Sequence, residues 1–322
     1  MTLRHHSSPR ALRASALGIV AVLAALAACA LSPSDAGAQR GRRRPAAASE
    51  EGAEPSGPQP TVRDIDTIAA RLQSQNPDEV REAIDLLSVI DHPSVVPHLA
   101  SLLRSGRSDE VTDRALLALR GLAHPSAIEV LTEFTHHRRA RARRLAYQAL
   151  AAIQDRRVPA LLEHGLSDSD RSVRAQCARS LGEIGASGSV DTLVLAFDRG
   201  VVEAAISIGK LGNRAAIGRF NEHLGHMPLS VMLSGYNEFV RRSDIPDEAK
   251  IDIVGRLGDI SGDMVRVFLQ RYLDTFSMGR AAQRDRVRQV VIETLRRIPG
   301  HAGSARGRTV STDSADAAGG DQ

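Results

Sequence analysis

Apolar residues recur along the chain in three columns that keep the same spacing. The first column holds small residues 32, 31, 31 and 27 positions apart, namely Ala83, Ala115, Ala146, Cys177 and Ala204. The second lies four residues later, at Leu87, Leu119, Leu150, Leu181 and Ile208. The third lies three residues after that, at Ile90, Leu122, Ile153, Ile184 and Leu211. Positions i, i+4 and i+7 share one helix face, and a repeat of about thirty residues is typical of stacked helical hairpins.

Further apolar positions, six and nine residues after the third column, predict the other helix of each hairpin. Asn76 before Pro77 predicts a helix start, because an Asn side chain caps the first turn and proline suits the first helical position. Ser108 and Asp170 are predicted caps at the equivalent places. Each unit therefore consists of a first helix, a turn, a second helix and a turn.

The regular pattern covers residues 62–215, where we predict five hairpins. Residues 216–299 continue as divergent helices, and the last of them, at about 283–298, has a polar, Arg-rich face that suits the end of a stack. The low-complexity residues 300–322 are expected to be a disordered tail. We predict an all-α fold, an α-α superhelix of stacked hairpins over residues 61–299, with disordered N- and C-terminal segments.

Residues 1–28 have the features of a bacterial signal peptide, because three arginines precede an uncharged Ala/Leu/Val run. Two cleavage sites compete. The run Leu26-Ala27-Ala28-Cys29 resembles the lipobox of lipoproteins, in which the cysteine is acylated, so Cys29 is a candidate lipidation residue. The alternative is an ordinary cut after Ala38. Both predict export, to the periplasm or as an outer-membrane-attached lipoprotein, and residues 29–60 are expected to form a disordered linker.

Composition favours a solenoid over a nucleic-acid binder. Aromatic residues make up only 3 % of the chain and Trp is absent, whereas Ala, Leu, Ile and Val fill thin, regular layers well. The net charge of +4 falls to +1 without the leader residues Arg4, Arg10 and Arg13. A nearly neutral body argues against nucleic acid, since its binders carry a strongly basic face.

The repeat in residues 168–185 also carries a family resemblance. It matches the pattern Asp-x-Asp-x-x-Val-Arg-x-x-Ala-x-x-x-Leu-Gly-x-Ile-Gly, with Cys177 one residue before Ala178. This pattern resembles the short bacterial HEAT repeats, a subgroup named for its similarity to phycocyanobilin lyase subunits. Residues 79–83 keep the Val-Arg step, and the fifth unit lacks the Arg. The resemblance covers roughly half the chain and implies an α-solenoid that holds another macromolecule.

The sharpest local feature is residues 136–144, with seven basic side chains in nine residues and no acid. We expect this stretch at the turn and start of the second helix of the third unit. Because guanidinium groups bind carboxylate or phosphate bidentately, it is a candidate site for an acidic ligand, formed by Arg138, Arg139, Arg141, Arg143 and Arg144. The alternative is a solvated turn whose arginines pair with acids of adjacent layers, Asp155, Asp168 and Asp170.

No motif for catalysis, metal or cofactor binding appears in the chain. Gly182–Gly185 and Gly209–Gly212 fall at helix ends, where we expect glycine as a C-cap rather than a phosphate loop. The adjacent His136 and His137 point about 100° apart on a helix and cannot share a metal. Cys177 is expected to pack like the alanines of its column. We therefore predict no catalytic residues, no metal and no cofactor, and a chain that is not an enzyme.

The resulting hypothesis is a non-enzymatic protein-binding or scaffold module exported to the bacterial envelope. The second helices are expected to line the concave side and to present Arg81, Asp85, Arg144, Gln148, Arg174 and Arg179 to a partner. Because these positions mix charges, a mixed-charge protein surface suits them better than a polyanion. Two alternatives stay open: a binder of nucleic acid or acidic glycan that uses Arg138–Arg144, and a lyase-like enzyme related to the bilin lyases.

Overall fold

The computed structural model describes residues 61–260, 262–276 and 285–298. Within these ranges the regular structure is helical and no residue belongs to a strand, so the all-α prediction is confirmed there. The predicted signal peptide (1–28), linker (29–60) and tail (300–322) lie outside the described residues.

The first ten α-helices form five consecutive hairpins, each joined by a short turn. They are α1 with α2 (Val62–Ala70, Pro77–Ser88), α3 with α4 (Val95–Arg104, Asp109–Leu122), α5 with α6 (Ile128–Phe134, Ala140–Ala152), α7 with α8 (Val158–Gly165, Arg171–Glu183) and α9 with α10 (Val190–Asp198, Ala204–Leu211). Three short 3-10 turns, η1 (Arg71–Gln73), η2 (Pro125–Ala127) and η3 (Ser187–Ser189), lie between these helices.

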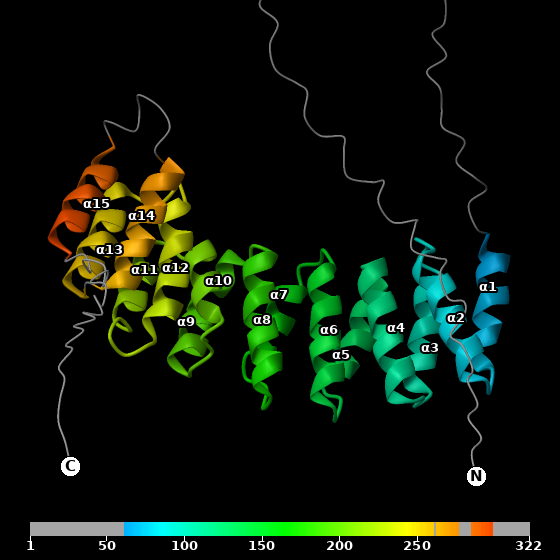
Figure 1. The fold of residues 1–322 in the computed structure, drawn as a ribbon. Coiled ribbons are helices and arrows are strands. Elements are labelled where there is room, and N and C mark those ends of the chain that lie inside the picture. The colour runs from blue at the N-terminus through cyan, green and yellow to red at the C-terminus, as the bar shows by residue number, and fades with distance from the viewer. Residues whose placement is uncertain (1–60, 261, 277–284, 299–322) are drawn as a thin grey trace, which may run out of the picture. The chain divides into compact units, whose positions relative to one another are not determined.

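The second helices of the hairpins lie side by side in one row (Figure 1). Each of α2, α4, α6, α8 and α10 packs on the next, and α12 (Leu229–Arg241) continues the row. The first helices contact their own second helices and approach one another less closely. The result is the predicted solenoid of stacked hairpins, and we call this closely packed set of helices the second-helix row.

The core lies between the two helices of each hairpin and the next layer. All members of the small-residue column and of the second apolar column are fully buried. The third column is buried at Ile90 and Ile153 but only partly buried at Leu122, Ile184 and Leu211, which lie near helix ends. The periodic pattern therefore identifies the core at almost every position, because it marks the helix face that meets the neighbouring layer.

The divergent C-terminal part also consists of helices. They are α11 (Arg214–Asn221), α12, α13 (Asp247–Ile260), α14 (Asp263–Phe276) and α15 (Arg286–Arg297). The α15 helix buries Val287 and Val291 and exposes Arg286 and Arg296, which agrees with its predicted polar face. Aromatic side chains gather where this part meets the fifth hairpin, with Phe220 against Phe197, Tyr236 and Phe239.

The predicted helix caps are confirmed. Asn76, Ser108 and Asp170 precede α2, α4 and α8, and each side chain accepts a backbone N–H of the first turn. The α6 helix differs, because its N-cap residue Arg139 makes no side-chain capping bond and the first turn carries no acid.

The predicted role of the glycines is only partly correct. Gly185 has φ +72° after α8 and caps that helix, with the Ala186 N–H donating to the Leu181 carbonyl oxygen 3.1 Å away in the Schellman manner. Gly182 and Gly209 lie inside α8 and α10, where a Cβ would overlap Ser207 Oγ and the Gly235 carbonyl oxygen. These two glycines are needed for close packing along the second-helix row, so their prediction as caps is wrong.

Candidate functional site

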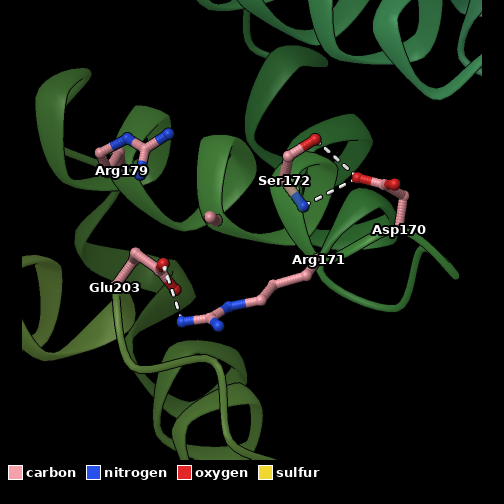
Figure 2. Close-up of a pocket in the computed structure, with 6 residues that line it drawn as sticks. Asp170, Arg171, Ser172, Arg179 and Glu203 are labelled. Carbon is pink, nitrogen blue, oxygen red and sulfur yellow. Dashed lines mark hydrogen bonds and ion pairs between the residues drawn. The ribbon is translucent and has the colours of Figure 1, made fainter.

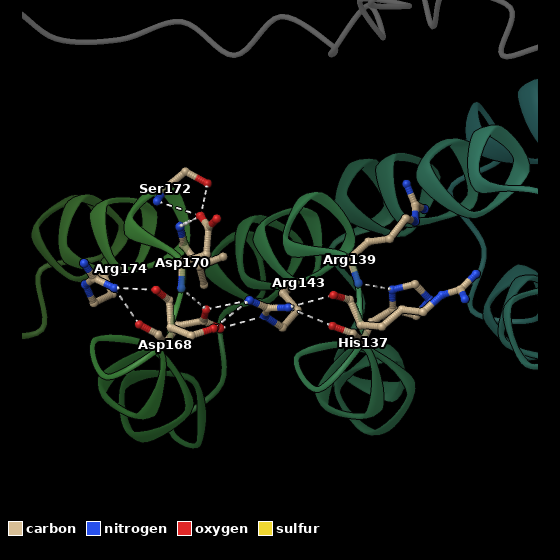
Figure 3. A network of polar contacts seen from close by, with 10 residues as sticks. His137, Arg139, Arg143, Asp168, Asp170, Ser172 and Arg174 are labelled. Carbon is tan, nitrogen blue, oxygen red and sulfur yellow. Dashed lines mark hydrogen bonds and ion pairs between the residues drawn. The ribbon is translucent and has the colours of Figure 1, made fainter.

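The basic stretch lies at the α5–α6 turn and the first turns of α6, as predicted (Figure 3). Arg138 is exposed at the turn. His137 stacks on Phe134 and accepts the Arg139 backbone N–H at Nδ1, 3.1 Å away. Burial, together with the charges of Arg139 and Arg138, holds the pKa of His137 below its ordinary value. A neutral imidazole reduces the charge of the stretch.

Arg139 and Arg141 reach back to the preceding second helix, α4. Arg139 Nη2 donates to Asp113 at 2.8 Å, and Arg141 Nε donates to the other oxygen of the same carboxylate at 2.6 Å. Arg139 Nε also lies 2.9 Å from Asp109 in an ion pair that lacks hydrogen-bond geometry. Two arginines of the predicted patch are therefore partly neutralised by acids of α4.

Arg143 instead crosses to the following layer. It donates two hydrogen bonds to the Asp168 carboxylate, at 2.7 and 2.8 Å, and one to the His137 carbonyl oxygen at 3.0 Å. Burial alone would raise the pKa of Asp168, but the hydrogen bonds from Arg143 and the Asp170 N–H outweigh it, so the pKa lies below its ordinary value. The contact ties the α5–α6 turn to the α7–α8 turn (Figure 3).

Arg174 occupies the same place on α8 as Arg143 on α6, 31 residues later. Each donates to backbone carbonyls five and six residues before it, and Arg174 binds those of Ser169 and Asp168 at 3.0 and 2.7 Å. We call this arrangement the turn clamp. The guanidinium groups of Arg143 and Arg174 are therefore directed into the turns of the fold.

The alternative prediction of pairing with adjacent acids is correct for Asp168 only. Asp155 binds Arg157 two residues away, which lowers its pKa to about 2, mainly through the side-chain hydrogen bond. Asp170 caps α8 and accepts the backbone N–H groups of Ser172 and Val173. Spacing alone could not separate these acids, because a short Asp side chain near a helix start also serves as a cap.

Three further predicted residues, Arg81, Asp85 and Gln148, join neighbouring helices of the row. Arg81 pairs with Asp78 on its own helix and, at 3.0 Å, with Glu110 on α4. Gln148 on α6 donates to Gln176 on α8 at 2.9 Å. A second contact between α2 and α4 is the hydrogen bond that Arg114 Nε on α4 donates to Asp85 on α2, at 2.7 Å.

The remaining predicted arginines have few partners among the described residues. Arg144 is partly buried and donates no side-chain hydrogen bond there, and its buried Nε has no acceptor. Arg179 makes one long bond, 3.4 Å, to Gln176. Arg138 takes part in no ion pair within the described part of the chain.

A hollow of about 470 Å³ lies between α8 and the start of α10 (Figure 2). It is lined by Asp170, Arg171, Ser172, Ala175, Arg179 and Glu203. Arg171 Nη2 lies 3.8 Å from Glu203 Oε1, beyond hydrogen-bond distance, and Glu203 Oε2 is buried without a donor. Sequence reasoning missed Glu203 and Ala175. Aligning the second helices would have shown Ala175 at the position of Arg81, Asp113 and Arg144, where a small residue leaves space.

The lone described cysteine is part of the core. Cys177 is fully buried, and burial raises the pKa of its thiol well above the ordinary value. Burial also raises the pKa of the neighbouring Tyr147 to about 12. Both groups remain protonated at neutral pH, so neither has the character of a nucleophile there. Within the described ranges, no group of three or more His, Cys, Asp or Glu residues is placed to hold a metal ion.

A family model for HEAT repeats matches residues 65–151, 96–181 and 128–207. Residues 65–207 are HEAT repeats. These HEAT repeats comprise most of the five hairpins and end within α10, before the divergent helices. No curated protein matches the sequence. Among the described helices, none combines the length and the apolar character that a membrane span requires.

Three solved structures are similar to the chain at low identity. The complex of CpcE and CpcF of phycocyanin lyase from Nostoc sp. PCC7120 is 17% identical, with a TM-score of 0.40, over 78% of this chain and 100% of that chain. Human deoxyhypusine hydroxylase in complex with glycerol is 16% identical, with a TM-score of 0.37, over 73% and 96%. A designed armadillo repeat protein in complex with the peptide (KR)4 is 16% identical, with a TM-score of 0.29, over 72% and 99%.

Proposed function

We propose that this chain is a non-enzymatic scaffold that binds another protein on its second-helix row. One observation carries the proposal. Two positions after each small-column residue, the row presents one outward residue per layer: Asp85, Leu117, Gln148, Arg179 and Ile206. Gln148 is half-buried and the other four are exposed. Such a strip mixes acidic, basic, amide and apolar groups at regular spacing, which suits the similarly mixed surface of a protein partner.

The HEAT-repeat fold is compatible with this role, because stacked hairpins offer an extended surface that contacts many residues of a partner at once. The bridges between α2 and α4, and between α6 and α8, add to the proposal. They hold neighbouring helices in register, so that the outward residues keep fixed positions before a partner arrives.

Export to the bacterial envelope is the second part of the proposal, and it rests on the basic and apolar pattern of residues 1–28. Intact-mass measurement of the protein purified from its bacterial host distinguishes the two cleavage sites. A mature chain that begins at an acylated Cys29 supports a lipoprotein, and one that begins at Gln39 supports a soluble exported form. Retention of residues 1–28 would refute export.

Site-specific photo-crosslinking tests the binding surface. A photoreactive amino acid replaces Leu117 or Ile206 on the second-helix row, or Leu195 on α9, the first helix of the fifth hairpin. The cells that produce each variant are then irradiated. The three residues are matched in exposure, at 44%, 40% and 47%. We expect a discrete adduct with another protein from Leu117 and Ile206 and none from Leu195. Equal adducts from all three positions, or none from the row, would contradict the proposal.

A further inference from the structure

The hollow between α8 and α10 is the strongest candidate for a specific contact on the second-helix row. We propose that it receives an acidic segment of the partner protein, with a carboxylate held by Arg171 and Arg179 and a backbone N–H donated to Glu203. The inference rests on the proposed function, since it names the chemistry of the partner at one place on the same row.

The distribution of charge along the row supports this assignment. On α2 and α4, Arg81 pairs with Asp78 and Glu110 and Arg114 pairs with Asp85, whereas Arg120 near the end of α4 takes part in no ion pair with a described residue. The α6 helix contains no acid, and α8 contains only Glu183 at its last position. The acids that compensate the arginines of this α6–α8 half of the row come from other elements, Asp113 for Arg139 and Arg141 and Asp168 for Arg143. Three arginines of the same half take part in no ion pair with a described residue, namely Arg144, Arg174 and Arg179.

Within that half, the arginines differ in the bonds that they already make. Arg143 and Arg174 are engaged in the turn clamp, and Arg141 is bound to Asp113. Arg171 is 74% exposed and donates no hydrogen bond to any described residue, and Arg179 makes only its long bond to Gln176. These two guanidinium groups keep the donors that bind a carboxylate bidentately, and both line the hollow (Figure 2).

The hollow also explains why a peptide fits better than a small anion. Ala175 is the small residue that opens it, whereas α6 carries Arg144 at the equivalent position. The Glu203 carboxylate has no hydrogen-bond donor on Oε2, and its side chain is 25% exposed at the hollow, where a backbone N–H of a ligand can approach it. A peptide offers both groups, a carboxylate for the arginines and a backbone N–H for Glu203.

A nucleic acid fits the same row less well. The exposed acids Asp78, Glu82 and Glu110 of α2 and α4 outnumber the two arginines that pair with them, Arg71 and Arg81, and this excess of negative charge disfavours a phosphate backbone that follows the row. The hollow contains no aromatic side chain on which a base could stack. An acidic protein segment requires guanidinium donors at one place only. Arg171 and Arg179 provide them, beside the carboxylates of Glu203 and of Asp170, which caps α8.

Fluorescence anisotropy with the full mature chain tests the inference. The probes are a labelled decapeptide of alternating Glu and Gly, the same peptide with Gln in place of Glu, and an oligothymidylate of equal length. We expect the Glu peptide to bind at least about tenfold more tightly than the Gln peptide. Arg171→Gln and Arg179→Gln should each remove most of that difference. Arg138→Gln, which removes an exposed arginine away from the hollow, should leave it unchanged.

Three results would overturn the inference. They are equal binding of the Glu and Gln peptides, an equal loss of affinity in Arg138→Gln, and tighter binding of the oligothymidylate than of the Glu peptide. The last would indicate a general polyanion surface. If crosslinks form at Leu117 and Ile206 but the Glu peptide shows no preference, the scaffold function stands and this chemistry fails. If the crosslinks are also absent, the proposed function itself fails.

Discussion

The smallest residues decide how closely the helices approach one another. Gly165 ends α7 where α6 and α8 meet, and a Cβ there would overlap Cys177 Sγ and lie 2.7 Å from Tyr147 Cζ. The thiol and the ring are both buried, so neither can turn toward solvent. Cys177 itself stands in the column otherwise occupied by alanine, and its larger sulfur explains why the facing residue is reduced to glycine.

We predict that Gly165→Ala lowers the free energy of unfolding by about 1–3 kcal/mol, because overpacking forces Tyr147 or Cys177 from its position. Urea unfolding followed by circular dichroism measures the change. Gly121→Ala is the matched control, since no heavy atom lies within 4 Å of its added Cβ and the site is inside α4. It should stabilise the protein by about 0.5–1 kcal/mol. Unchanged stability in Gly165→Ala would contradict the close contact.

At the level of the elements, helices and caps were predictable from the sequence, whereas the partners of the arginines were not. Apolar spacing marks the buried face of each helix, and a capping residue such as Asn76 or Asp170 marks where a helix begins. Both signals are readable because periodicity and capping depend on residues only a few positions apart. Arg139, Arg143 and Arg174 bind atoms in three different places, namely α4, the next turn and their own turn. A long side chain can reach any of these, and the choice depends on how the layers are stacked.

The contact between Arg143 and the Asp168 carboxylate predicts a pH dependence of stability. The pKa of Asp168 is lower in the folded than in the unfolded chain, because the Arg143 hydrogen bonds outweigh the opposing effect of burial. Its contribution is therefore full above the unfolded value of about 3.9 and is lost as the pH falls toward the folded value. We predict that Asp168→Asn destabilises the protein at neutral pH by about 1–3 kcal/mol and makes stability less sensitive to acid.

Urea unfolding at neutral pH and at about pH 3 measures this difference. Asp191→Asn is the control, because Asp191 also pairs with an arginine, Arg219, but its side chain is 84% exposed. Exposed ion pairs contribute less than about 1 kcal/mol, so this variant should stay close to the wild type at neutral pH. An Asp168→Asn variant that loses as much stability in acid as the wild type would show that the contribution of the Arg143–Asp168 contact does not depend on the carboxylate charge.

For the described molecule as a whole, the repeat predicts how the hairpins stack. It does not predict how the regular hairpins join the divergent helices that follow them. The apolar columns stop near Leu211, and the residues after it still form helices, with the aromatic side chains Phe220, Tyr236 and Phe239 in the core of α11 and α12. There, Tyr236 on α12 donates to Asn221 at 2.8 Å, and Asn221 donates to Asp252 on α13 at 3.2 Å. This network, which is buried at Tyr236 and Asn221 and exposed at Asp252, joins α11, α12 and α13 by contacts between positions 15 and 31 residues apart, which no local pattern reveals.

We predict that Tyr236→Phe loosens only the C-terminal helices. The variant leaves the Asn221 oxygen buried without its donor, at a cost of about 1–3 kcal/mol. In a solenoid each layer contacts only its neighbours, so the loss should be local. Native-state hydrogen exchange should show weaker amide protection in α11, α12 and α13 and unchanged protection in α2 and α4.

Leu119→Ala, a fully buried change in α4, should give the reverse distribution. A uniform loss of protection in either variant would mean that all layers unfold as one unit, which would contradict the prediction that the C-terminal helices open independently of α2 and α4.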